Sequence, residues 1–283
     1  MRYQADHDLH IHSYISPCAG HDSRQTKEAI LSYGLTNEFG LLCVTDHFWD
    51  RKVAEANDMW WLGLGLDIEK AKEILPLPQS PMCRFLFGME VDMDAEGNVG
   101  ISREEYDTFD FLILAPSHVH IVEQYKTMHA GETVTEAHKR WYKERIFGFL
   151  NMDLPYSKCG LAHFTTGLVC RTDPIKVFEL FSNEEYREIF GLVAKRGVGV
   201  ELNIGKKLHE YVREPDVLEQ ILRPYRIARE MGCKFYLGGD AHEPEAFAGR
   251  KALFEQLIDL LELTEEDKFP LVKKHLAEIK ERQ

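Results

Sequence analysis

Seven short apolar segments alternate with helical segments along this chain, and no other feature of the sequence constrains its fold as strongly. The apolar segments are 8–12, 40–47, 83–90, 109–117, 158–164, 197–203 and 234–240. They are rich in Val, Ile, Leu and Phe and mostly lack a strict polar alternation, which is typical of parallel strands buried on both faces. We therefore predict an α/β fold, a (β/α) barrel with seven strands in place of eight.

The segments between these strands carry the start and stop signals of helices. Such signals frame the segments 26–34, 67–75, 182–197 and 215–232. The first is expected to begin after Thr26 and to stop at Gly34, and Pro224 is expected to kink or divide the last. Residues from about 244 to 283 are predicted to form two helices that dock on the exterior of the barrel.

No internal repeat, low-complexity tract or linker divides the chain, so we predict a single barrel domain over residues 1–283. Two connections between strands are long, at 48–82 and 118–157. Long connections at the C-terminal ends of barrel strands usually shape access to the substrate. Trp60 and Trp61 lie in the first of them and either contribute to this access or pack an extra helix onto the barrel.

Composition excludes several classes of protein. Asp and Glu number 47 against 34 Lys and Arg, and the net charge of −13 disfavours binding to long nucleic acid or to an anionic membrane. We expect no signal peptide and no transmembrane helix, because no charged n-region precedes an apolar stretch and no apolar run reaches about 18 residues. The six cysteines include no Cys-x-x-Cys pair, which favours reduced thiols and a cytoplasmic location.

Metal-ligating side chains are concentrated at the ends of the predicted strands. The chain has 13 histidines, and six of the seven strands end in His, Glu or Asp. The six ends are His10-Ile11-His12, Thr45-Asp46-His47, Gly88-Met89-Glu90, Ser117-His118-Val119-His120, Ala162-His163 and Gly238-Gly239-Asp240-Ala241-His242. Residues two apart in an extended segment face the same side, so paired ligands converge. One tetrahedral ion uses three or four ligands, and this larger set therefore predicts two or three metals.

This series of motifs (HxH, TDH, GxE, SH, AH and GGDAH) resembles the polymerase and histidinol phosphatase (PHP) superfamily of metal-dependent phosphoesterases. The resemblance runs from about residue 7 to residue 242. It implies a distorted, TIM-like (β/α)7 barrel with a trinuclear metal site at the C-terminal ends of the strands. Ligation by His and carboxylates suits Zn²⁺, Mn²⁺ or Fe²⁺, so two or three of these divalent ions are the expected cofactors.

The resemblance implies three metal sites on this sequence. The first is held by His10, His12, Glu90 and Asp240, the second by Glu90 as a bridge with His118 and His163, and the third by His47, His242 and His21. Catalysis would depend on Asp240, His242 and Glu90. His120 is a rival for His118, which we favour because it lies nearer to the predicted strand.

The third site has a second candidate ligand in the loop after the first strand. In the histidinol phosphatase branch this region resembles H-x-H-x-x-x-C-x-H, and here Cys18 and His21 are displaced by about three residues. We favour His21, because Pro17 restricts the reach of Cys18 and Gly20 lets the chain turn back toward the barrel. A thiolate from Cys18 would bias the site toward Zn²⁺, whereas an imidazole leaves Mn²⁺ or Fe²⁺ acceptable.

Other residues are candidates to bind the substrate or to orient the ligands. Lys206 follows Gly205 after the sixth strand, and Arg171 lies eight residues after His163, so either side chain can bind phosphate or remain solvated. Asp46, Asp6 and Asp8 lie beside ligands in the sequence and are candidates to orient them. Asp46 can equally cap the segment that follows it.

We therefore predict a metal-dependent phosphoesterase in which a metal-activated hydroxide hydrolyses a small phosphomonoester, with histidinol phosphate first among the candidates. A nucleotide or sugar phosphatase, a nuclease of the same family, and hydrolysis of a non-phosphate bond are the enzymatic alternatives. A non-catalytic, metal-binding regulatory module is the alternative of a different class. The expected partner is a small phosphorylated molecule rather than a membrane or extended nucleic acid, and the oligomeric state stays open.

Overall fold

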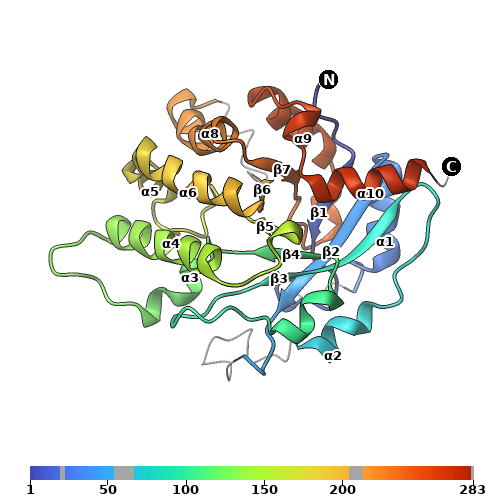
Figure 1. Ribbon diagram of the computed structural model, residues 1–283, viewed down its shortest axis with the longest axis horizontal. Coiled ribbons are helices and arrows are strands. Elements are labelled where there is room, and N and C mark those ends of the chain that lie inside the picture. The colour runs from blue at the N-terminus through green and yellow to red at the C-terminus, as the bar shows by residue number, and fades with distance from the viewer. Residues whose placement is uncertain (20–22, 54–66, 204–212, 282–283) are drawn as a thin grey trace.

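The computed structural model describes residues 1–19, 23–53, 67–203 and 213–281. Within these residues, seven parallel strands form one sheet in the order of the sequence, and the sheet curves into a barrel (Figure 1). The strands are β1 (His7–Ile11), β2 (Leu41–Phe48), β3 (Arg84–Val91), β4 (Phe111–Leu114), β5 (Cys159–Leu161), β6 (Gly199–Leu202) and β7 (Lys234–Leu237). All seven predicted strands are confirmed.

The first and last strands meet at their C-terminal ends and nearly close the barrel. The amide of His12 donates to the carbonyl of Ala241 at 3.0 Å, and the amide of Asp240 donates to the carbonyl of His10 at 2.7 Å. A seven-stranded parallel sheet that returns to its first strand confirms the predicted TIM-like barrel. This closure also places the HxH motif beside the GGDAH motif.

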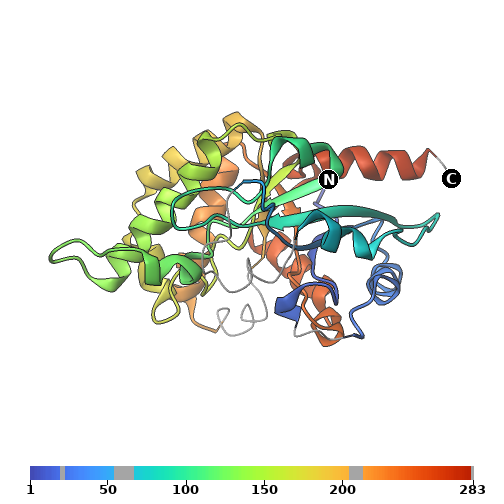
Figure 2. The same ribbon diagram turned by 90° about the horizontal axis from the view of Figure 1, so that it is seen from below.

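Helices occupy the connections and surround the barrel (Figures 1 and 2). The α-helices are α1 (Lys27–Thr36), α2 (Ile68–Ala71), α3 (Val119–Val122), α4 (Val134–Asn151), α5 (Pro174–Leu180), α6 (Asn183–Arg196), α8 (Pro215–Glu230), α9 (Arg250–Leu260) and α10 (Pro270–Lys280). Short 3-10 helices are η1 (Pro17–Ala19), η3 (Lys72–Ile74), η4 (Arg103–Thr108), η5 (Glu123–Tyr125), η6 (Tyr156–Lys158), η8 (Pro244–Phe247) and η9 (Glu265–Asp267). Among the described residues, no helix has both the length and the apolar character needed to span a bilayer.

The structure confirms the predicted helix start at Thr26 and the predicted stop at Gly197, but not the predicted stop at Gly34. The hydroxyl of Thr26 caps α1 as expected, and Gly197 ends α6 in the left-handed region with φ 74°. The predicted stop at Gly34 is wrong, because α1 continues to Thr36. Gly34 is small for a packing reason instead: a Cβ there would lie 2.5 Å from the side chain of Leu42 on β2.

The long connections and the Pro224 segment differ partly from expectation. Helix α8 runs continuously through Pro224, so the proline does not divide it. The connection over 118–157 contains α3 and α4, and most of it is therefore ordered helix rather than loop. Trp60 and Trp61 lie outside the described residues.

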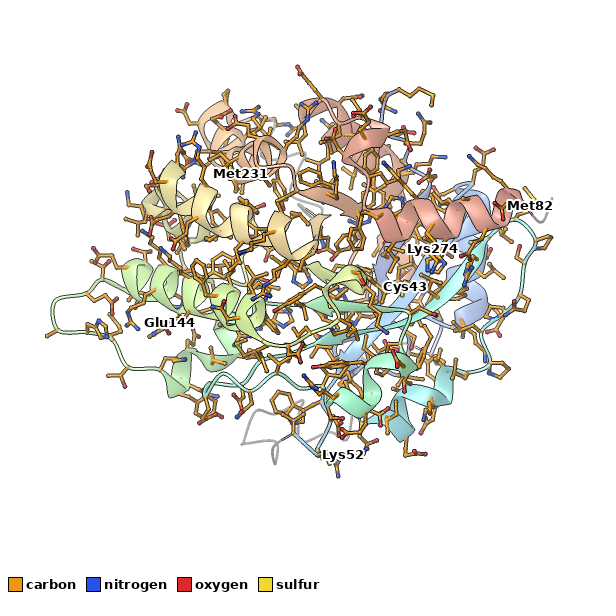
Figure 3. All side chains as sticks on the ribbon, in the orientation of Figure 1. Cys43, Lys52, Met82, Glu144, Met231 and Lys274 are labelled. Carbon is orange, nitrogen blue, oxygen red and sulfur yellow. The ribbon has the colours of Figure 1, made fainter. Side chains whose placement is uncertain are left out.

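Apolar side chains fill the barrel interior below the polar strand ends. This interior cluster contains Leu9, Leu41, Cys43, Leu86, Phe111, Ile113, Ala162, Tyr236, Phe269 and Val272, and Cys43 is labelled in Figure 3. Phe269 immediately precedes α10, and Val272 lies in it. This helix therefore contributes to the barrel interior and does not only dock on the exterior as predicted. A larger apolar cluster packs the helices against the outer face of the strands.

The barrel interior generates a stability prediction at Gly160 in β5. A Cβ at this position would lie 2.6 Å from the hydroxyl oxygen of Tyr236, whose ring packs against Phe111 at a centroid distance of 5.1 Å. We expect Gly160→Ala to lower the free energy of unfolding by about 1–3 kcal/mol, because the ring has little room to move. Gly167→Ala is the control, since nothing lies within 4 Å of its Cβ. Urea unfolding of both variants measures the effect, and equal stabilities would contradict this account of the core.

Candidate metal centre

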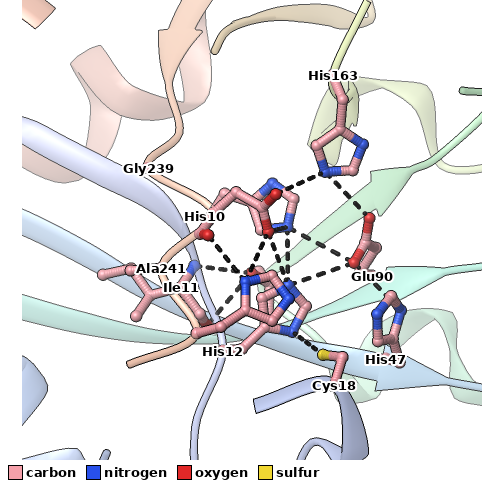
Figure 4. A network of polar contacts seen from close by, with 12 residues as sticks. His10, Ile11, His12, Cys18, His47, Glu90, His163, Gly239 and Ala241 are labelled. Atoms are coloured by element: carbon pink, nitrogen blue, oxygen red, sulfur yellow. Dashed lines mark hydrogen bonds and ion pairs between the residues drawn. The ribbon is translucent and has the colours of Figure 1, made fainter. Parts of the chain in front are cut away.

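Eight of the nine predicted ligands meet at the C-terminal end of the barrel (Figure 4). They are His10 and His12 at the end of β1, His47 in β2, Glu90 in β3, His118 after β4, His163 after β5, and Asp240 and His242 after β7. The ninth, His21, lies outside the described residues. Six of the eight are buried, whereas the side chains of Asp240 and His242 are 24% and 34% exposed. The centre therefore opens toward solvent beside β7.

A first group of donor atoms has the spacing of ligands on one ion. The Nε2 atoms of His10 and His12 are 3.2 Å apart, and Oδ1 of Asp240 lies 3.5 Å and 3.1 Å from them. Oε2 of Glu90 lies 3.6 Å and 3.4 Å from the same two nitrogens. Ligands around one ion with bonds of about 2.1 Å are separated by about 3.0–3.5 Å, so these four donors fit a single divalent metal.

A second group forms around the other oxygen of Glu90. Oε1 of this carboxylate lies 3.5 Å from Nε2 of His118 and 3.4 Å from Nε2 of His163. Oε1 is buried and accepts no hydrogen bond from any described residue. Such an oxygen is costly in a protein interior unless a cation or donor satisfies it. The donor set therefore fits a second metal, with Glu90 placed between the two groups.

The third predicted site contains a thiol in addition to imidazoles. His242 stacks on His12 with ring centroids 4.2 Å apart, and Cys18 Sγ lies 3.6 Å from Nδ1 of His12. Burial would raise the pKa of the Cys18 thiol, but the charges of His12 and His47 outweigh it and lower that pKa to about 2. His12, Cys18 and His47 offer donor atoms that all lie within 4.8 Å of one another. The structure thus brings Cys18 to the cluster, while the role of His21 stays a prediction.

Two of the imidazoles are oriented by neighbouring polar groups that sequence reasoning did not assign to them. Oδ1 of Asp92 lies 2.6 Å from Nδ1 of His118, and the hydroxyl of Ser117 lies 3.1 Å from Nδ1 of His163. Both contacts occupy Nδ1 and leave Nε2 directed at Glu90. The missed signal was the strand alternation, because Asp92 follows Glu90 by two residues and so faces the same side.

Glu201 on β6 is a further carboxylate that the sequence analysis missed. It is fully buried, accepts a hydrogen bond from Nδ1 of His10 at 2.6 Å, and accepts another from the amide of His163 at 2.8 Å. A Cβ at Gly238 would lie 2.7 Å from its carboxylate carbon. The first glycine of the GGDAH motif therefore leaves room for Glu201. β6 was the one strand without a predicted terminal ligand, and it contributes a carboxylate that contacts ligands from other strands and whose oxygen lies within 4.8 Å of donor atoms of His10 and His163.

Among the described residues, none of the three aspartates predicted to orient ligands contacts a candidate ligand's imidazole: Asp6 pairs with the side chains of His7 and Lys268, and the other two act largely on the backbone. Asp8 accepts hydrogen bonds from the amide of Gly239 at 2.8 Å and the amide of His10 at 3.2 Å, and so joins β1 to the segment after β7. Burial raises its pKa to about 6. Asp46 accepts from the amide and the hydroxyl of Ser13, both at 2.6 Å, and thereby fixes the loop after β1 rather than an imidazole.

Two residues of the centre have strained backbones. His163 and Asp240 adopt positive φ values of 45° and 50°, a region that costs a non-glycine residue on the order of 1 kcal/mol or more. The bond from the His163 amide to Glu201 and the bond from the Asp240 amide to His10 hold these conformations. Strain maintained at two adjacent ligands is typical of functional sites.

Of the two residues predicted to bind substrate, the structure describes only Arg171. Arg171 is exposed, and its charge acts on His120. Burial of His120, together with the charges of His118 and Arg171, lowers the pKa of His120 to about 3. His118 approaches Glu90, whereas the ring of His120 meets His118 edge-on at 5.6 Å. Lys206 lies outside the described residues. Their roles as ligands of phosphate stay predictions.

Comparison with known proteins addresses the fold. No family model and no curated protein matches the chain. A candidate histidinol phosphatase, hisK, from Listeria monocytogenes is similar over 88% of this chain and 99% of its own, with 15% identity and a TM-score of 0.56. The chain therefore shares the fold of this structure. At this identity the likeness concerns the fold alone.

Two further solved structures are similar over much of the chain but superpose poorly. A dihydropteroate synthase from Xanthomonas albilineans covers 90% of this chain and 95% of its own, with 13% identity and a TM-score of 0.33. A triazine hydrolase variant covers 84% of this chain and 58% of its own, with 12% identity and a TM-score of 0.37. These scores carry no argument about fold or site.

The position of Glu201 predicts an effect on metal affinity. In Glu201→Gln the amide keeps the shape but loses the charge that makes His10 a stronger ligand, so we expect metal affinity to fall about 10–100-fold. Glu123→Gln is the matched control, because Glu123 pairs with His138 at 2.9 Å outside the centre. Competition with a chelator measures both affinities. An unchanged affinity in a folded Glu201→Gln protein would show that this carboxylate does not support the ligands.

The two candidates for the third site predict different metal contents. With His21 as the ligand, His21→Ala should lose about one metal ion per chain, and Cys18→Ala should keep most of its metal. Elemental analysis of both purified variants measures this. Loss of metal from the Cys18 variant alone would identify the thiolate as the ligand and would reverse the preference drawn from the sequence.

Proposed function

We propose that this protein is a metal-dependent phosphoesterase of the PHP type that hydrolyses a small phosphomonoester. The observation that carries the proposal is the position of Glu90, which presents Oε2 to one donor group and Oε1 to another. A carboxylate shared in this way is suited to hold two divalent cations side by side. Paired ions of this kind stabilise the attacking and leaving oxygens of an in-line phosphoryl displacement and lower the pKa of water.

The chain's own residues supply the ligands, their orientation and a water-poor environment. Glu201 and Asp92 engage Nδ1 of His10 and His118, which keeps the Nε2 atoms available to cations. Glu90 is almost fully buried, so its charge is poorly screened by solvent. Asp240 is the more exposed carboxylate of the centre and faces the opening by which a phosphate group would enter.

Charge supports a small anionic substrate. Glu90 and Asp240 contribute two negative charges, Asp92 and Glu201 add two more beside the ligands, and a Cys18 thiolate would add a fifth. Three divalent ions would contribute six positive charges and leave the loaded centre positive, within a chain whose net charge is −13. A phosphomonoester dianion is attracted to such a centre, while the acidic remainder of the chain disfavours a long nucleic acid.

Histidinol phosphate is the first candidate substrate within this class. Support comes from the motif resemblance and from the hisK structure, whose own description is that of a candidate histidinol phosphatase. We also propose a cytoplasmic setting, because all six cysteines are free in the structure and five of them are buried.

The test is turnover of p-nitrophenyl phosphate after metal removal and reloading with Mn²⁺, Zn²⁺ or Fe²⁺. We expect metal-dependent release of phosphate, and Glu90→Gln should lose metal and nearly all turnover while the barrel stays folded by circular dichroism. Glu123→Gln should behave like the unaltered protein. A protein that binds its full metal complement but shows no turnover on any phosphomonoester would instead be a non-catalytic metal-binding module, and full activity of Glu90→Gln would refute the bridge.

A further inference from the structure

A buried arginine beside the metal centre has a side-chain nitrogen without a hydrogen-bond partner. Arg250 is the first residue of α9 and is only 5% exposed. Its Nε atom is buried and makes no hydrogen bond, and across the described part of the chain no carboxylate forms an ion pair with the guanidinium. The charge of Asp8 partly compensates that of Arg250, but a buried donor without an acceptor still costs free energy. An acceptor group that entered beside the guanidinium would therefore meet an unused donor at Nε.

Arg250 lines a pocket that is shared with the metal centre. The pocket has a volume of about 360 Å³, and its lining includes Asp240 and His242 together with Gly239 and Asn203. A Cβ at Gly239 would lie 3.4 Å from Nε of Arg250. The backbone of the second glycine of the GGDAH motif thus lies close to both Asp8 and Arg250. An anion held in this pocket would lie next to two of the predicted metal ligands.

The nearest buried carboxylate does not account for Arg250. Both oxygens of Asp8 already accept hydrogen bonds, Oδ1 from the amides of Gly239 and His10 and Oδ2 from the hydroxyl of Tyr33 at 2.8 Å. Asp8 feels the charge of Arg250 but receives no hydrogen bond from it. Satisfying Asp8 therefore does not require an arginine at position 250.

A second buried arginine shows how this chain satisfies a structural guanidinium. Arg145 on α4 is 2% exposed and donates to the carbonyls of Met93 at 2.7 Å, Pro116 at 3.0 Å and Ala115 at 3.3 Å. These bonds join α4 to the ends of β3 and β4, and they use the donors of the guanidinium. Arg250 has the same degree of burial without any such bond. The contrast indicates that the donors of Arg250 are reserved for a ligand.

We propose that Arg250 binds an oxyanion of the substrate, a phosphate or a carboxylate, in the pocket that adjoins the metal centre. The proposal rests on the proposed function and deepens it, because it assigns a residue to recognition of the substrate's negative charge. A guanidinium presents two parallel donors to either oxyanion, whereas a lysine presents a point charge. Arg250→Lys should therefore retain part of the binding and Arg250→Gln should lose most of it.

The experiment measures anion binding by calorimetry on the metal-loaded protein, with no need for turnover. The probes are inorganic phosphate and phosphonoacetate, a non-hydrolysable molecule that carries a phosphonate and a carboxylate. Arg226→Gln is the control, because Arg226 pairs with Glu219 on the exposed face of α8. Metal content and melting temperature are recorded for every variant, and Arg250→Lys serves if Arg250→Gln does not fold.

Two outcomes support the proposal and distinguish the source of the oxyanion. Phosphate binding that weakens tenfold or more in Arg250→Gln, at unchanged metal content, assigns Arg250 to the phosphoryl group. Weaker phosphonoacetate binding with unchanged phosphate binding assigns it to a carboxylate. Equal affinity of the unaltered and Arg250 proteins for both probes overturns the proposal. Because these affinities do not depend on catalysis, a protein that lacks turnover but binds anions through Arg250 would refute the proposed function alone.

Discussion

The buried carboxylate of Glu90 is the group on which the rest of the centre depends. It lies at the end of β3 and is almost completely buried. Five imidazoles have a nitrogen within 3.6 Å of its oxygens, and they come from the ends of β1 and β2 and from the segments after β4 and β5. A carboxylate in this position is tolerable only if positive charge surrounds it. The charges of His47 and His118 accordingly keep its pKa well below the ordinary value, although burial opposes them. Divalent ions would supply the same compensation more strongly.

Around this group the fold adds further buried carboxylates, each with a definite function. Glu201 and Asp92 orient imidazoles, and Asp8 fixes the backbone between β1 and the GGDAH segment. The two glycines of that segment are small because Glu201 and Asp8 occupy the space next to them. A single motif therefore combines two features, candidate metal ligands in its Asp and His and room for neighbouring carboxylates at its glycines.

Much of the fold, and the convergence of eight candidate ligands, was accessible from the sequence, because both follow from local patterns. Strand ends converge in a barrel, so a His or Glu at each end predicts a shared site. Glu201 was missed because its role arises from contacts with His10 and His163 on other strands, and nothing near it in the sequence marks it. Gly34 was misread for the same reason: its small size serves packing against β2, a tertiary contact that overrides the local helix-stop signal.

The centre is asymmetric, because its candidate ligands differ in their exposure to solvent. His163, Glu90 and His10 are almost completely buried, whereas Asp240 and His242 are the exposed members and line the pocket with Arg250. Within the described residues, the pocket beside β7 and α9 therefore places Arg250 and the exposed donors nearer to solvent than the buried ones. The opposite side is closed, since Arg145 ties α4 to the carbonyls that follow β3 and β4. Rigid closure on one side and a free guanidinium on the other would orient an entering anion toward Glu90.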